Sequence, residues 1–368
     1  MLVINKKNQN GQYCEGKDVD MRQSLLERCE AQIHNEAVLR KADRFEFEQL
    51  IKFGAFMHAS AERESDPRRI KACKLVLQEK ALAFARFREP LKYVLQTKMA
   101  LSDDPIVFIE DVLDVYEQLR EGRMQPGEVL AMAATAIVEN CPADRRDAVV
   151  EKAIAEYEKA AELRSLLGDS PDVLLVILMV MAGKEADQAA GEIRDLLQEM
   201  KEKYRLDSNA ARYIAMVLVL SDNPVDNKVA DLFRLFDACD KTGHATSADN
   251  LMVVYTIFAD SKYDFGELVT AISEVDEWLK KKKGYGSFGI GGHGRSLFAA
   301  LLACEDIDAD CTVVAPDGAS AMADVPDEAN TMADVPDEAS AMADVLVKRP
   351  VPILTMLILV FVIASKAR

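Results

Sequence analysis

Apolar residues between positions 18 and 304 recur mainly at intervals of three and four, and not at intervals of two. In the stretch from Ile109 to Leu119, for example, the apolar positions form one stripe down a helix. Only 17 Gly and 12 Pro interrupt the 368 residues, so long spans remain available for helices. The sequence therefore predicts an all-α body and argues against an all-β fold.

Four prolines indicate where helices begin, because each follows a residue type that caps helices and proline itself suits the first turn. The four dipeptides are Asp66-Pro67, Asp104-Pro105, Ser170-Pro171 and Asn223-Pro224. Between these signals the helices come in pairs, an amphipathic helix followed by a more apolar one. The pairs expected are 105–121 with 128–140, 145–167 with 171–182, 186–204 with 208–220, 225–240 with 247–259, and 265–283 with 295–304.

The second helices of these pairs recur about every 40 residues, which is the size of a two-helix repeat. The segment 172–183, DVLLVILMVMAG, is apolar all round and needs neighbours on both sides, which stacked hairpins supply. We predict an irregular α-α superhelix, solenoid-like, of stacked helical hairpins over residues 101–304, preceded by a helical bundle over 18–100. A compact globular array of helices is the alternative.

The two ends of the chain differ from this body. Residues 1–17 are expected to be disordered, and their first ten residues, MLVINKKNQN, lack the apolar core of a signal peptide. From Glu305 to Asp344 there are twelve acidic residues and no basic one, and the decapeptides ASAMADVPDE and ANTMADVPDE follow one another. Since each unit holds too little apolar surface to offset chain entropy, residues 305–347 are expected to form a disordered acidic linker.

Residues 348–368 form a short apolar segment with basic residues at both ends. Its core, PVPILTMLILVFVIAS at 350–365, would rise about 24 Å as a helix, whereas a membrane span needs roughly 20 residues. Three interpretations stay open: a C-terminal membrane anchor, a strand or helix docked on the body, and an aberrant coding end. With an anchor, the body stays on the cytoplasmic face of the membrane.

The formal net charge is −17, from 45 basic and 62 acidic residues. This is the wrong sign for a chain that binds phosphate backbones, so no nucleic-acid partner is expected. Seven cysteines stand singly with no CxxC pair, as do buried, reduced thiols in cytosolic proteins. We expect a cytoplasmic protein whose acidic surface favours a basic protein partner.

The chain carries the segment ARFREPLKYVLQTKMALSDDPIVFIEDVLDVYEQL, then EVLAMAATAIVEN, and a Gly-rich stretch before RSLFAALLA. With these segments it resembles an uncharacterised bacterial family catalogued as domain of unknown function 4003, over roughly residues 20–304. The resemblance implies a bacterial, all-helical protein and transfers no catalytic residue. The decapeptide repeat and the apolar end depart from the family pattern.

One stretch of this chain fits the GxGxxG pattern and runs into a helix expected near Arg295, with a run of four lysines just upstream. Backbone amides at a helix start and nearby ammonium groups could hold a phosphate. The ligand contacts expected are Lys282, Lys283, Gly284, Gly286, Gly289, His293 and Arg295. A dinucleotide fingerprint, however, follows a strand of a βαβ unit, and this loop follows a helix. We favour a flexible or tightly turning loop, with the anion site as the alternative.

Signatures of catalysis and metal binding are missing from the sequence. The four histidines stand far apart without HExxH, no Cys or His has zinc spacing, and there is no GxSxG elbow. We therefore expect no catalytic residue, no metal and no cofactor. The function expected is a non-catalytic protein–protein interaction scaffold in which stacked hairpins offer a long groove. A binder of phosphorylated ligands, or an enzyme, centred on residues 284–294 is the alternative.

Overall fold

The computed structural model of the chain describes residues 21–42, 46–80, 89–167, 172–206, 209–221, 223–242, 256 and 264–313. Within these ranges every regular element is a helix, so the all-α prediction is confirmed. The segment 1–17, the decapeptide repeats and the apolar segment 348–368 lie outside the described residues.

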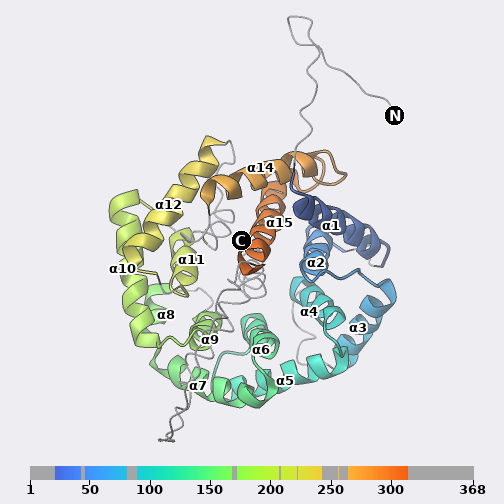
Figure 1. Cartoon of the computed structure of the whole chain (residues 1–368). Helices are drawn as coiled ribbons and strands as arrows, with labels where there is room; N and C mark the ends of the chain where they lie inside the picture. The colour runs from blue at the N-terminus through green and yellow to red at the C-terminus, as the bar shows by residue number, and fades with distance from the viewer. Residues whose placement is uncertain are drawn as a thin grey trace, which may run out of the picture.

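The helices are named as in Figure 1. In chain order they are α1 (Gln23–Ala42), α2 (Glu48–Ser60), α3 (Pro67–Lys80), α4 (Glu89–Leu101), α5 (Pro105–Glu121), α6 (Glu128–Asn140), η2 (Ala143–Arg145), α7 (Arg146–Lys159), α8 (Ala161–Leu167), α9 (Asp172–Met181), α10 (Ala186–Tyr204), α11 (Asn209–Leu218), α12 (Val225–Lys241), α14 (Phe265–Lys280) and α15 (Gly291–Val313).

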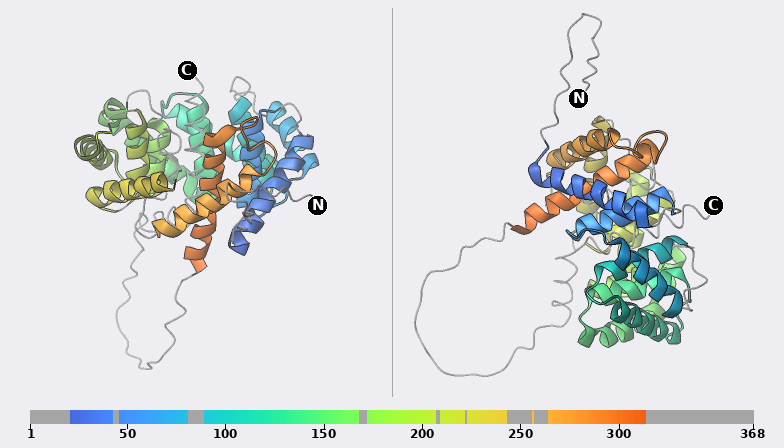
Figure 2. Two further views of the ribbon diagram at one scale, coloured as in Figure 1. Left: turned by 90° about the horizontal axis from the view of Figure 1, so that it is seen from above. Right: turned by 90° about the vertical axis from the view of Figure 1, so that its right-hand side faces the viewer.

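The helical hairpins stack side by side into a superhelix that closes on itself as a ring (Figure 1). Helices α1, α3, α5, α7, α10, α12 and α14 lie on the outside, and α2, α4, α6, α9, α11 and α15 lie inside them. The ring closes because α15 packs against both α1 and α2. Both views in Figure 2 likewise place α14 and α15 beside α1. The predicted superhelix is therefore confirmed, but its two ends meet.

Helices α1 to α4, which the sequence assigned to a preceding bundle, form the first two hairpins of this ring (Figure 1). One continuous set of buried apolar side chains extends from Leu25 to Cys304 through all of the hairpins. The inner helix α9 is buried along its side chains from Val173 to Met181. The outer helix α5 buries only one stripe, which includes Ile109 and Val112. This division matches the predicted order of an amphipathic helix followed by an apolar one.

Local capping explains several helix starts. The Asp104 carboxylate accepts hydrogen bonds from the backbone N–H groups of Ile106 and Val107, at 2.8 and 3.2 Å, and Pro105 opens α5 as predicted. Helix α12 begins at Val225, as predicted, but Pro224 is its N-cap residue with an extended backbone and does not lie in the first helical turn. The predicted helix 247–259 lies outside the described residues apart from Thr256.

Two predicted helices have different bounds in the structure. The predicted helix 145–167 is interrupted at Ala160, whose N–H donates to the Tyr157 carbonyl three residues back, which tightens the turn between α7 and α8. The last helix starts at Gly291 rather than near Arg295 and runs to Val313, past the expected boundary at Cys304. The body thus extends into the first residues of the segment expected to be linker.

Candidate functional site

The Gly-rich loop lies between α14 and α15, at the place where the ring closes. It folds back on itself through backbone hydrogen bonds. The Gly284 carbonyl accepts from Ile290 N–H at 3.1 Å, and the Gly286 carbonyl accepts from Gly289 and Gly291 N–H at 2.9 and 3.1 Å. These bonds use carbonyl groups within the loop and deliver the chain into α15. The loop is therefore a tight turn, one of the two forms that the favoured interpretation allowed.

Two of the three glycines in the GxGxxG pattern are needed for close packing. Gly284 has φ +84°, and a Cβ there would contact the Glu48 carboxylate and lie 3.1 Å from Lys52 Nζ. A Cβ on Gly289 would collide with the Gly284 carbonyl. A Cβ on Gly286 would meet nothing within 4 Å. Gly284 thus allows the loop to approach α2, and Gly289 allows the loop to close on itself, two roles that the sequence pattern did not reveal.

Tyr285 is the residue that this turn buries. Its side chain is 0% exposed and makes an edge-to-face contact with Phe298 of α15, with ring centroids 6.1 Å apart. Its hydroxyl accepts a hydrogen bond from the Gln32 amide of α1 at 3.1 Å. Burial, and then the charge of Glu36, raise the pKa of the Tyr285 hydroxyl far above its usual value. Tyr285 therefore stays neutral and joins the last hairpin to the first.

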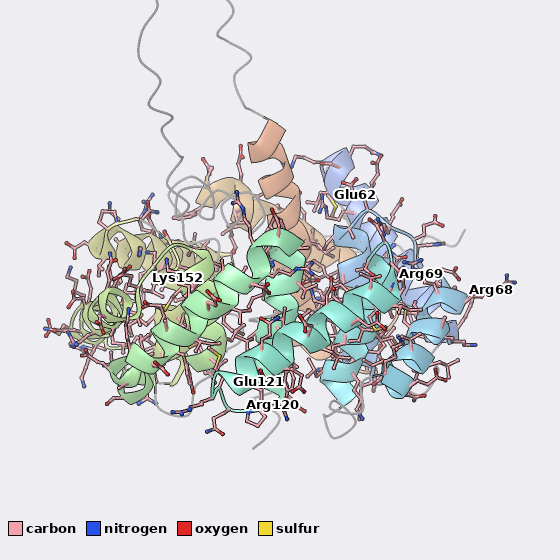
Figure 3. All side chains as sticks on the ribbon, turned by 90° about the horizontal axis from the view of Figure 1, so that it is seen from below. Glu62, Arg68, Arg69, Arg120, Glu121 and Lys152 are labelled. Atoms are coloured by element: carbon pink, nitrogen blue, oxygen red, sulfur yellow. The ribbon has the colours of Figure 1, made fainter. Side chains whose placement is uncertain are left out.

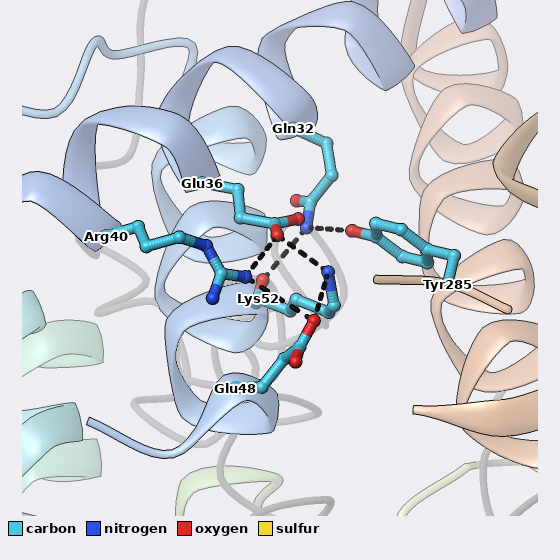
Figure 4. A network of polar contacts seen from close by, with 6 residues as sticks. All are labelled: Gln32, Glu36, Arg40, Glu48, Lys52 and Tyr285. Carbon is cyan, nitrogen blue, oxygen red and sulfur yellow. Dashed lines mark hydrogen bonds and ion pairs between the residues drawn. The ribbon is translucent and has the colours of Figure 1, made fainter. Parts of the chain in front are cut away.

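Lys52 of α2 lies against the Tyr285 ring, with Nζ 3.7 Å from the ring centroid (Figure 4). Its side chain is fully buried and its ammonium group contacts Glu36 at 2.7 Å and Glu48 at 3.5 Å. Burial lowers the pKa of Lys52, whereas its hydrogen bond to Glu36 acts in the opposite direction. A buried ammonium group is tolerated here because two carboxylates and an aromatic ring surround it.

Arg40 of α1 completes this group of side chains. We call the group the closure network, and its members are Gln32, Glu36, Arg40, Glu48, Lys52 and Tyr285 (Figure 4). Arg40 lies 2.7 Å from Glu36, and this hydrogen bond raises the pKa of the Arg40 guanidinium. Gln32 also donates to the Lys52 carbonyl at 2.9 Å. With two carboxylates and two cations, the closure network is electrically balanced.

A lysine with a lowered pKa beside a tyrosine resembles the arrangement that activates amine nucleophiles. In the closure network, however, both Lys52 and Tyr285 are fully buried and are held by partners from three helices or loops. One oxygen of Gln32 and one of Glu36 are buried without a hydrogen-bond partner in the described part of the chain. The network's evident role is to hold the two ends of the ring together.

The structure separates the remaining residues of the predicted ligand site. Lys282 Nζ lies over the Trp278 ring, 3.8 Å from its centroid. Arg295 pairs with Asp276 at 2.9 Å and donates to the Tyr285 carbonyl at 3.4 Å. Lys283 and His293 are exposed to solvent. Lys282 and Arg295 are thus engaged within the chain, whereas Lys283 and His293 face solvent.

Sequence reasoning missed every member of the closure network that lies on α1 and α2, because these residues are more than 200 positions from the loop. One local signal was available. Lys52 interrupts the apolar run LIKFGAFM, and a single lysine between Ile51 and Phe53 in a buried helix calls for a charged partner nearby.

The described residues offer neither a metal site nor an activated thiol. No group of three or more His, Cys, Asp or Glu side chains there is arranged to hold a metal ion. The five cysteines whose side chains are described are buried thiols outside any disulfide, and burial raises the pKa of Cys141 to about 11. No helix within the described ranges is both long and apolar enough to cross a membrane.

Comparison with protein-family models matches residues 37–314 to a family described as "Protein of unknown function (DUF4003)". This chain belongs to the DUF4003 family. The match runs from the last turns of α1 to the end of α15, so it includes Arg40, Glu48, Lys52 and Tyr285 of the closure network, whereas Gln32 and Glu36 precede it. No curated protein and no solved structure matches the chain.

Proposed function

We propose that this DUF4003 body is a non-catalytic scaffold for protein–protein interaction. The observation that carries the proposal is that two of the cations expected to bind a ligand, Lys282 and Arg295, are engaged within the chain. Lys282 lies on Trp278, and Arg295 pairs with Asp276. A phosphorylated ligand at this loop would have to displace those contacts, whereas a protein partner on the outside of the ring would not.

The charge of the outer helices favours a basic partner. Helices α5, α7, α10, α12 and α14 each carry more acidic than basic residues. Complementary charge speeds encounter and excludes partners of the same sign. We therefore propose a partner that presents lysines and arginines to the outside of the ring.

The scaffold proposal is tested with the full-length chain as bait in a lysate of its source cell. Glu121→Lys on α5 and Asp195→Lys on α10 change two exposed acidic positions, and Lys283→Ala in the loop is the control. We expect one saturable partner whose capture weakens with added salt and with either acidic variant, but not with the control. Capture that depends only on Lys283 would contradict the proposal.

The alternative, a phosphorylated ligand at residues 284–294, has its own test. Trp278 is the only tryptophan of the chain, and Lys282 lies on its ring. Binding of inorganic phosphate or a nucleotide at this lysine would change the fluorescence of Trp278. We expect no saturable change on titration, and a saturable change lost in Lys282→Ala would favour the alternative.

We also propose that residues 348–368 hold the scaffold at the cytoplasmic face of a membrane. The support is the uninterrupted apolar run at 350–365, flanked by basic residues, since soluble proteins seldom expose such a run. Deletion of residues 345–368 should move the protein from the membrane fraction to the supernatant. Equal membrane association with and without these residues would refute the anchor.

A further inference from the structure

Helix α3 differs in charge from the other outer helices. It carries five basic residues and one acidic residue. Helix α1 is balanced, and the outer helices α5, α7, α10, α12 and α14 each have an acidic surplus. On a chain with a net charge of −17, this is the one outer helix in the described part with a basic surplus. Acidic groups that contact the basic residues of α3 would explain this basic surplus.

Part of the basic surplus of α3 serves the fold. The Arg69 guanidinium donates to the carbonyls of Ala100 at 2.7 Å and Asp103 at 3.1 Å, so it caps the turn between α4 and α5. Lys80 pairs with Glu110 of α5. These two side chains are therefore accounted for by contacts between neighbouring helices.

A second set of α3 side chains faces outward. Arg68, Lys71 and Leu75 are spaced by three and four residues, so they share one helix face, and all three are exposed. Leu75 is 60% exposed, although the opposite face buries Ile70 and Leu77 in the core. Figure 3 shows Arg68 at the periphery of the ring, directed away from it. We call Arg68, Lys71 and Leu75 the α3 outer face.

The α3 outer face combines two cations with one apolar side chain, and the chain's own sequence contains its complement. Residues 314–347 hold eight acidic residues and no basic one. In both complete decapeptides a valine stands between carboxylates, in Asp324-Val325-Pro326-Asp327 and in Asp334-Val335-Pro336-Asp337. Carboxylates would face Arg68 and Lys71 while a valine covers Leu75.

The place where the described helices end makes this contact reachable. Helix α15 ends at Val313 and packs against α1, and α3 packs against the same α1. Eleven residues from Val313 to Asp324 reach at most about 40 Å when extended. A 20-residue helix such as α1 is about 30 Å long. The 21 residues from Val313 to Asp334 in the second decapeptide extend to about 70 Å, more than twice the length of α1, so the acidic decapeptides have ample chain to pass α1 and meet the α3 outer face.

We propose that the acidic decapeptides within residues 314–347 bind the α3 outer face of their own chain. Tethering favours the contact, because a linked segment is present at an effective concentration in the millimolar range. The contact would cover the one basic outer helix and leave the acidic helices open to a basic partner. It goes beyond the scaffold proposal, which concerns those acidic helices and does not require the tail to bind.

The test is zero-length carbodiimide crosslinking of the full-length chain in a neutral detergent, followed by mass spectrometry of the joined peptides. Light and heavy isotope-labelled chains are mixed, so that crosslinks within one chain are told from crosslinks between chains. Lys203 of α10, another exposed lysine, is the reference amine. We expect crosslinks within one chain from Lys71 to carboxylates of residues 317–344, at least about fivefold more abundant than those from Lys203, and lost near 1 M salt.

Two variants that keep Lys71 as the reporter sharpen the test. Arg68→Glu and Leu75→Ser should each reduce the crosslink from Lys71 at least about threefold, since each removes one part of the complementary face. Arg120→Glu on α5 makes the same change in net charge and should leave the crosslink unchanged, and circular dichroism verifies that all variants fold. Equal yields at Lys71 and Lys203, or crosslinks chiefly between chains, would overturn the proposal.

Discussion

Replacing Tyr285 by alanine should open the ring at the seam, which is the place where α15 packs against α1 and α2. The substitution removes a fully buried aromatic ring that contacts Phe298, Lys52 and Gln32. Loss of a buried aromatic side chain of this size costs about 3–5 kcal/mol in the free energy of unfolding. Tyr285→Phe removes only the hydroxyl, while Gln32 keeps its bond to the Lys52 carbonyl, so its cost should be about 0.5–1.5 kcal/mol.

Chemical denaturation followed by circular dichroism measures the two costs, and hydrogen exchange shows where the structure opens. In Tyr285→Ala, amides of α1, α2 and α15 should exchange well before the rest of the ring, because these helices form the seam. Tyr116→Ala is the matched control, since Tyr116 is a buried tyrosine of α5, on the opposite side of the ring (Figure 1). It should lose comparable stability without selective exchange at the seam.

The difference in unfolding free energy between Tyr285→Ala and Tyr285→Phe tests whether the Tyr285 ring holds the seam. If Tyr285→Ala costs no more than Tyr285→Phe, the ring of Tyr285 does not hold the seam. If the seam amides are no more exposed in Tyr285→Ala than in Tyr116→Ala, the closure network is not what joins the two ends. Either result would refute the structural role assigned to this loop.

Three further predictions concern a buried histidine, a glycine with positive φ and a buried carboxylate. Burial lowers the pKa of His58 from 6.5 to about 4. As the pH falls, the unfolded chain therefore takes up a proton at His58 before the folded chain does. The free energy of unfolding is unaffected by His58 above pH 6.5 and falls by about 3 kcal/mol as the pH drops to 4. His58→Gln should flatten this decline in urea unfolding at several pH values. Gly284→Ala should cost at least about 1–2 kcal/mol from its positive φ alone, whereas Gly286→Ala, with open space around its Cβ, should change the melting temperature little. Glu156→Ala should cost about 1–3 kcal/mol in denaturant unfolding, because the Ala186 N–H that donates to its carboxylate at 2.8 Å is left buried and unpaired.

The helices that local signals predicted best are those with a clear apolar period, to which α5 adds the Asp104 cap. The expected ranges 105–121, 128–140 and 186–204 are the bounds of α5, α6 and α10. Each of these bounds depends on residues within one or two turns, so no distant contact was needed to find them. The start of α15 was misplaced because glycine is a poor helix former, and its propensity was overridden by the turn that Gly286 closes.

Some features of the candidate site were likewise predictable from local sequence, and others were not. The sequence identified the Gly-rich loop and its tight turn, since glycines after a lysine-rich helix end are a local signal. It did not identify Tyr285 as the residue that matters there, because the partners of Tyr285 lie on α1 and α2. The Gln32 amide that meets its hydroxyl is 253 positions away, and no spacing rule relates residues at that separation.

The sequence alone determined that this chain is helical, that its helices pair, and which helix of each pair is buried. Those properties follow from the period of apolar residues and from caps, which act over a few residues. Only the tertiary structure decided that the superhelix closes, and that a buried lysine, two glutamates and a tyrosine hold the seam. Closure depends on the sum of small rotations between successive hairpins and on contacts between the ends, and neither quantity is written in any local pattern.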